Sequence, residues 1–154
     1  MLAPVITYRR AYRFDMPPDE LWGQIEQVDQ FERWWPWLTE FSLDGAGLSE
    51  GSVLRGMVNP PVPYRMRILV RLVGCERPSS IDATIEGDLT GQARLRLRPD
   101  PGGTSAEVAW TVEMQQPAMR LASRFGRPLL QWGHDRVVEM TVAGFRRRIE
   151  SQQE

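Results

Sequence analysis

The stretch TGQARLRLRPDPGGTSAEVAWTVEM, residues 90–114, contains two runs in which apolar and polar side chains alternate. In the first run, arginines stand between the apolar residues Ala93, Leu95 and Leu97. In the second run, the apolar positions are Ala106, Val108, Trp110, Val112 and Met114. This period of two predicts strands over residues 90–98 and 104–114, each with one buried face. The prolines and glycines of residues 99–103 predict the hairpin loop that joins them.

The same alternation, interrupted by turn residues, occurs upstream of this hairpin. It predicts further strands over residues 5–14, 37–43, 51–58, 64–74 and 80–87. After the first strand, two prolines followed by Asp19 and Glu20 predict the first turn of a helix. Residues 29–34 predict a second short helix, which Pro36 ends. The prolines of residues 59–63 predict a rigid turn.

The C-terminal part of the chain is expected to cover the apolar face of these strands. Residues 117–149 have helical spacing, and Gly126-Arg127-Pro128 predicts a kink or break within them. The predicted fold class is therefore α+β, with an antiparallel sheet of about seven strands around a long C-terminal helix and two short helices after the first strand. We expect a single domain over residues 1–154, with its core at about residues 5–149.

The charge balance and the rare residue types exclude several classes of function. The 154 residues carry 19 basic and 20 acidic side chains, so we expect no nucleic-acid partner. All the basic residues are arginines, which excludes lysine Schiff-base chemistry. With one histidine and one cysteine, Cys75, we expect no metal, no cofactor and no disulfide within the chain.

The distribution of apolar residues bears on location and assembly. No run approaches the roughly 18 apolar residues of a membrane span, so we expect no integral membrane association. The first residues lack the apolar stretch of a signal peptide, so we expect a cytoplasmic protein. A monomer and a homodimer both remain open.

The order of the predicted elements resembles the helix-grip fold of the START-like superfamily, which includes the birch-pollen allergen and the polyketide cyclase/dehydrase-like proteins. Four local segments carry the resemblance: Glu20-Leu21-Trp22 after a proline pair, FERWWPW at residues 31–37, GDLTG at residues 87–91, and Gly102-Gly103-Thr104 leading to Val108-Ala109-Trp110. The resemblance covers about residues 5–149. It implies a curved sheet and a cavity between sheet and helix for lipids, polyketides, sterols or plant hormones, and it does not imply one reaction.

The residues expected to line such a cavity follow from strand parity and helical phase. They are Tyr12, Phe14, Met66, Ile68, Val70, Ile81, Ala83, Leu95, Val108, Trp110, Val112, Leu130, His134, Val137 and Thr141. A one-residue register slip would turn a whole strand's set outward. Trp34, Trp35 and Trp37 are not expected to face inward together, and Trp34 or Trp35 is expected near the surface or an entrance.

Three residues are candidates for acid/base chemistry: His134, Arg10 and Tyr12. Arg10 is a candidate polar group on the inner face of the first strand. His134 lies in the apolar arc of the last helix, where it would act as a general acid/base or be a half-buried side chain bonded to the backbone. Successive helical residues point about 100° apart, so Asp135 is expected to face solvent and not to pair with His134.

Three functions remain open, and the sequence favours the first. It is non-catalytic binding of a hydrophobic small molecule such as a lipid, polyketide-like or aromatic compound, for transport or sequestration. The second is an enzyme, a polyketide aromatase/cyclase or dehydratase. It is disfavoured because few polar groups converge on the predicted cavity. The third is an interaction module like the Hsp90-activating START-like proteins, which needs an exposed docking patch.

Overall fold

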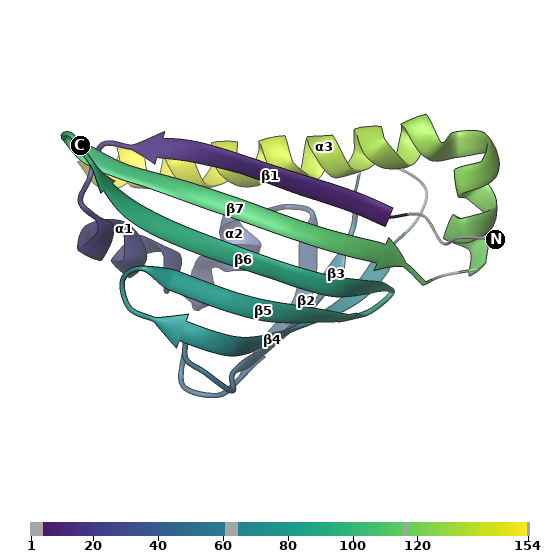
Figure 1. The fold of residues 1–154 in the computed structure, drawn as a ribbon, viewed down its shortest axis with the longest axis horizontal. Helices are drawn as coiled ribbons and strands as arrows, with labels where there is room; N and C mark the ends of the chain where they lie inside the picture. The colour runs from purple at the N-terminus through teal and green to yellow at the C-terminus, as the bar shows by residue number, and fades with distance from the viewer. Residues whose placement is uncertain (1–4, 61–64, 116, 154) are drawn as a thin grey trace.

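A computed structural model describes residues 5–60, 65–115 and 117–153, with the backbone alone described at 117–130 and 151–153. The elements follow the predicted order (Figure 1). They are β1 (Val5–Phe14), α1 (Pro18–Ile25), the 3-10 turn η1 (Val28–Gln30), α2 (Phe31–Trp34), β2 (Leu38–Asp44), β3 (Val53–Val58), β4 (Met66–Glu76), β5 (Ser80–Gly87), β6 (Leu89–Asp100), β7 (Gly103–Met114) and α3 (Pro117–Gln153). Of the predicted turn at 59–63 and the strand start at Tyr64, residues 61–64 lie outside the described residues.

Within the described residues, seven strands form an antiparallel sheet in the order β1-β7-β6-β5-β4-β3-β2. Its hairpin between β6 and β7 lies where it was predicted, but the strands extend to the pair Asp100 and Gly103, so the loop is shorter than the predicted residues 99–103. The register places Trp110 of β7 between Tyr8 of β1 and Ala93 of β6. Since side chains alternate along each strand, these residues share the inner face of the sheet.

Helix α3 runs lengthwise along the sheet close to β1, and α1 and α2 lie toward its C-terminal end (Figure 1). The helix continues through Gly126-Arg127-Pro128. Its first turns are nevertheless steeply inclined to its long later part (Figure 1). The helix therefore bends between its first turns and its long later part without losing its helical structure (Figure 1). A proline, which has no N–H to give to the preceding turn, is a common cause of such bends.

The core of the described part of the chain consists of two buried clusters. One joins Phe14, the α1 residues Leu21 and Trp22, and Phe145 and Ile149 of α3. The other joins Ile6, Val58, Met66, Val112 and Met114. Both clusters include residues that border the space between the sheet and α3. Each cluster therefore forms part of the boundary of this space.

Helices α2 and α3 approach each other at Gly144, which is buried. A Cβ atom at this position would overlap the backbone oxygen of Trp34 and lie 3.3 Å from Cδ1 of Trp35. A glycine is therefore required for this close approach. It brings α3 against the tryptophans that follow α2.

Candidate ligand cavity

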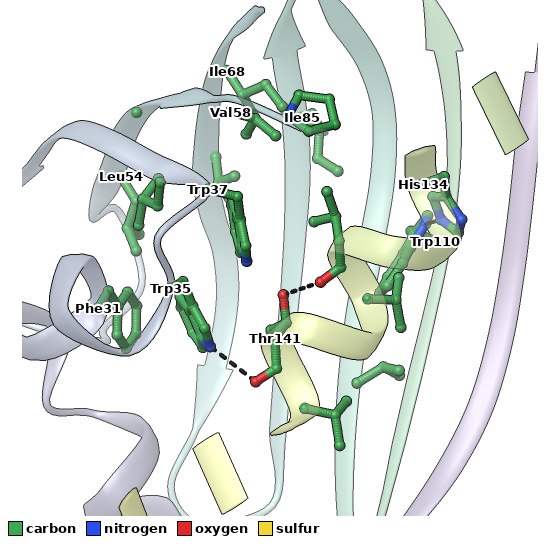
Figure 2. A pocket seen from close by; sticks show the side chains of 18 of the residues that line it. Phe31, Trp35, Trp37, Leu54, Val58, Ile68, Ile85, Trp110, His134 and Thr141 are labelled. Atoms are coloured by element: carbon green, nitrogen blue, oxygen red, sulfur yellow. Dashed lines mark hydrogen bonds between the residues drawn. The ribbon is translucent and has the colours of Figure 1, made fainter. Parts of the chain in front are cut away.

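A cavity of about 540 Å³ lies between the inner face of the sheet and α3 (Figure 2). Protein interiors rarely leave voids larger than a water molecule, and small-molecule sites typically measure about 300–1,000 Å³. The wall is almost entirely apolar and aromatic. Its polar side chains, apart from tryptophan indoles, are Tyr12, Arg55, His134 and Thr141. Such a space suits an apolar guest of small-molecule size.

Most residues placed on the cavity by parity do border it. They are Tyr12, Phe14, Met66, Ile68, Val70, Leu95, Val108, Trp110, His134, Val137 and Thr141. Ile81, Ala83 and Val112 do not border it, and the side chain of Leu130 lies outside the described residues. Ala83 and Val112 are 6% and 4% exposed, and Ile81 packs against a core cluster. Strand parity assigned these three residues to the inner face of the sheet. It could not show that neighbouring side chains separate them from the cavity.

The wall opposite β6 and β7 was largely missed from the sequence. It is built from Ile25, Phe31, Phe41, Leu54 and Val58, with the tryptophans beside them. The aromatic density of residues 31–41 was the available signal. It was not used because residues 31–37 cross from helix to strand, so no single period applies to them.

Trp34, Trp35 and Trp37 all border the cavity, so the expectation that they do not face inward together is wrong. Trp34 ends α2, and the backbone at Trp35 is already extended, with φ −127°. The change of backbone conformation turns successive rings to the same side. Trp35 stacks on Trp37 with ring centroids 5.6 Å apart and planes 15° apart. The Trp35 indole donates to the Thr141 carbonyl at 2.9 Å, which ties this aromatic wall to α3 (Figure 2).

His134 is held in a chain of hydrogen bonds at the side of the cavity near β7. The Trp110 indole donates to Nε2 of His134 at 3.1 Å, and Nδ1 of His134 lies 3.0 Å from Oδ1 of Asp135. An indole N–H can only donate, so Nε2 is the unprotonated acceptor and Nδ1 carries the proton toward Asp135. This geometry describes a neutral imidazole with both nitrogens engaged.

The expectation that His134 and Asp135 do not pair is therefore wrong. Asp135 does face solvent, with its side chain 51% exposed, but its carboxylate folds back to the imidazole. The hydrogen bond from His134 lowers the pKa of Asp135, and a second hydrogen bond from Gln131 acts in the same direction. The angle of about 100° between adjacent helical residues fixes the direction in which each side chain leaves the backbone. It does not prevent the outer atoms of two adjacent side chains from coming into contact.

Tyr12 and Tyr8 place two hydroxyls 2.5 Å apart on β1. Burial and this hydrogen bond raise the pKa of Tyr12 to about 12, so its phenol stays protonated at neutral pH. Arg10, between them in sequence, is exposed and does not border the cavity, although its guanidinium carbon lies 5.2 Å from the centre of the Tyr12 ring. Arg10 does take an inner-face position, opposite Val108, but on this edge strand its long side chain reaches solvent and not the cavity.

Two further features of the described residues limit the chemistry. They contain no group of three or more histidine, cysteine, aspartate or glutamate side chains placed to hold a metal ion. No helix among them combines the length and the apolar character needed to cross a bilayer.

The curved sheet gripping a long helix around an apolar cavity defines a helix-grip protein of the START-like superfamily. Within it, the chain belongs to the family described as polyketide cyclase / dehydrase and lipid transport, whose family model matches residues 6–150. No curated protein sequence matches the chain.

Solved structures with the same fold are distant in sequence. The Zhui aromatase/cyclase from Streptomyces sp. R1128 is 13% identical with a TM-score of 0.78, and the match covers 98% of this chain and 97% of that one. TTHA0849 from Thermus thermophilus is 15% identical with a TM-score of 0.77, over 98% and 100% of the two chains. The birch-pollen-allergen-like Ara h 8.0201 is 13% identical with a TM-score of 0.57, over 88% and 99%. At these identities the likeness shows the fold alone.

Proposed function

We propose that the protein binds a hydrophobic small molecule, such as a lipid, a polyketide-like compound or an aromatic compound, and carries or sequesters it without chemical change. The observation that carries this proposal is the pairing of polar groups around an apolar cavity. Tyr12 is bonded to Tyr8, Nε2 of His134 to the Trp110 indole, and the Thr141 hydroxyl to the Val137 carbonyl. Because these polar groups already have hydrogen-bond partners in the protein, they favour a binding function over a catalytic one.

The binding free energy would come from removing apolar surface from water. Each 100 Å² of apolar surface buried contributes about 2.5 kcal/mol, before the cost of immobilising the ligand. The aromatic wall at Phe31, Trp35 and Trp37 adds ring contacts, which favour flat molecules. The family description, which includes lipid transport, supports the same class of ligand.

The melting temperature measured with a panel of fatty acids, sterols and polycyclic aromatics tests this proposal. A ligand that binds only the native state, present at 100 times its Kd, stabilises by about 2.7 kcal/mol, which raises Tm by about 5–10 °C for a domain of this size. Val108→Phe places a ring in the cavity and is expected to abolish the shift, because Val108 borders the cavity on β7. Val73→Phe makes the same change at an exposed site on β4 and should keep the shift. If no compound shifts the wild-type Tm, the proposal is wrong.

A second candidate, an aromatase/cyclase, is favoured by one observation: His134 borders the cavity and is oriented by Asp135. Two of the similar structures are aromatase/cyclases, Zhui and the di-domain BexL. For His134 to take a proton at Nε2, it must first leave the Trp110 indole. Cyclisation of a linear polyketide that is lost in His134→Ala while ligand binding persists would establish this function. Binding without turnover in the wild type supports the carrier.

A further inference from the structure

The indole nitrogen of Trp37 is a buried donor at the cavity wall. Trp37 borders the cavity, and among the described residues no atom accepts a hydrogen bond from its Nε1. In Figure 2 its ring extends into the space between the sheet and α3, with the nitrogen at the inner end. A buried donor without an acceptor loses the hydrogen bond that it makes to water in the unfolded chain, so such groups are rare and call for a partner.

The neighbouring tryptophans differ in this respect. Trp35 is stacked on Trp37, and its indole donates to the Thr141 carbonyl. Trp34 borders the cavity and its Nε1 also has no acceptor among the described residues, but Trp34 is only 6% exposed and is packed edge-on against Trp35 and Phe145. Trp22 has an unpaired buried Nε1 too, yet it lies in the core and not on the cavity wall. Trp37 is therefore the residue with an unpaired indole donor whose side chain is the least buried of the three, and it borders the cavity.

The polar side chains of the cavity wall other than the tryptophans already have partners in the protein, so the Trp37 indole is the group to which a hydrogen-bond acceptor on the guest would bind. The Tyr12 hydroxyl, both nitrogens of His134 and the Thr141 hydroxyl are engaged with protein atoms. Arg55 pairs with Asp44 at 3.2 Å on the exposed side of β3. A guest with an oxygen acceptor near Trp37 would gain a hydrogen bond without breaking any of these contacts.

We propose that the ligand is a flat, ring-bearing molecule with a carbonyl or ether oxygen that accepts a hydrogen bond from the Trp37 indole while its rings lie against the aromatic wall. This inference rests on the proposed function, and it adds the acceptor and the residue that recognises it. An apolar lipid tail would fill the same volume but would leave the donor unpaired.

Fluorene and 9-fluorenone are probes of nearly the same shape, and only the second has a carbonyl. The quantity to measure is the ratio of the fluorene Kd to the fluorenone Kd, by equilibrium dialysis. Comparing this ratio between variants cancels the different hydrophobicities of the two probes. One hydrogen bond corresponds to about a 2- to 12-fold change in the ratio. We expect the ratio to fall by this factor in Trp37→Phe.

Trp35→Phe is the matched control, because it removes the same ring from the same stack but its indole is already bonded to Thr141. It is expected to weaken both probes and to leave their ratio unchanged. If Trp37→Phe does not fold, the wild-type indole N–H resonances decide the question by NMR. Fluorenone is expected to move the Trp37 resonance downfield more than fluorene does, while the resonance of Trp22 in the core stays in place.

The outcomes separate the two proposals. An unchanged probe ratio in Trp37→Phe, equal effects of both probes on the Trp37 resonance, or a response at Trp34 instead would overturn the Trp37 assignment and leave hydrophobic ligand binding intact. Failure of both probes and of the whole lipid and aromatic panel to bind the wild type would overturn the proposed function together with this inference.

Discussion

Tyr12 lies on the edge strand β1 and borders the cavity. Its titration reports whether its hydroxyl is buried and bonded to Tyr8. Its pKa is about 12 in the native state, because of burial and the hydrogen bond to Tyr8, against 10.0 ordinarily. The native state therefore favours the protonated phenol. The stability that the protonated Tyr12 contributes to the native state is fully present below pH 10. It is lost as the pH rises from 10 to about 12, because in this range the unfolded chain releases the Tyr12 proton and the native chain still holds it.

Absorbance of the phenolates should accordingly show one of the three tyrosines titrating near pH 12 in the native protein. Tyr12→Phe is expected to remove this late transition and to flatten the loss of stability above pH 10. Tyr8→Phe, which removes the hydrogen-bond partner but not the burial, should lower the transition without abolishing it. Three tyrosines titrating together near pH 10 would show that the pair does not form.

At the scale of elements, the cavity depends on how closely α3 approaches α2. Gly144→Ala puts a methyl group against the Trp34 carbonyl and the Trp35 ring, so we expect it to lower the free energy of unfolding by about 1–3 kcal/mol. Gly23→Ala in α1 is the matched control, because no atom outside its local backbone lies within 4 Å. It should stabilise by about 0.5–1 kcal/mol, since alanine favours a helix over glycine. Urea unfolding measures both, and equal effects would contradict this helix contact.

At the scale of the whole molecule, one end is packed and the middle is hollow. Leu21 is 0% exposed in the core, whereas Leu54 borders the cavity and lacks packing atoms on that side. We expect Leu21→Ala to cost about 4–5 kcal/mol and Leu54→Ala about 2 kcal/mol, the two ends of the range for leucine truncation. Chemical denaturation without ligand measures the difference. Equal costs would indicate that the interior closes around Leu54.

Residue patterns predicted the strands, the hairpin and the covering helix. The alternation of Met66, Ile68 and Val70 placed these side chains on the cavity, as the structure shows. This succeeded because the period of a strand depends only on neighbours in the chain. The same rule could not distinguish Val108, which borders the cavity, from Val112, which lies four residues further along β7 on the same face and belongs to a core cluster.

The sequence by itself determined which face of each strand is apolar and that a long helix must cover it, since both follow from local periodicity. Only the tertiary structure decided that three tryptophans share one wall, that Trp35 reaches Thr141, and that His134 lies between Trp110 and Asp135. The hydrogen bonds from Trp35 to Thr141 and from Trp110 to His134 join residues 106 and 24 positions apart. Their geometry depends on how whole elements pack, which no local pattern encodes.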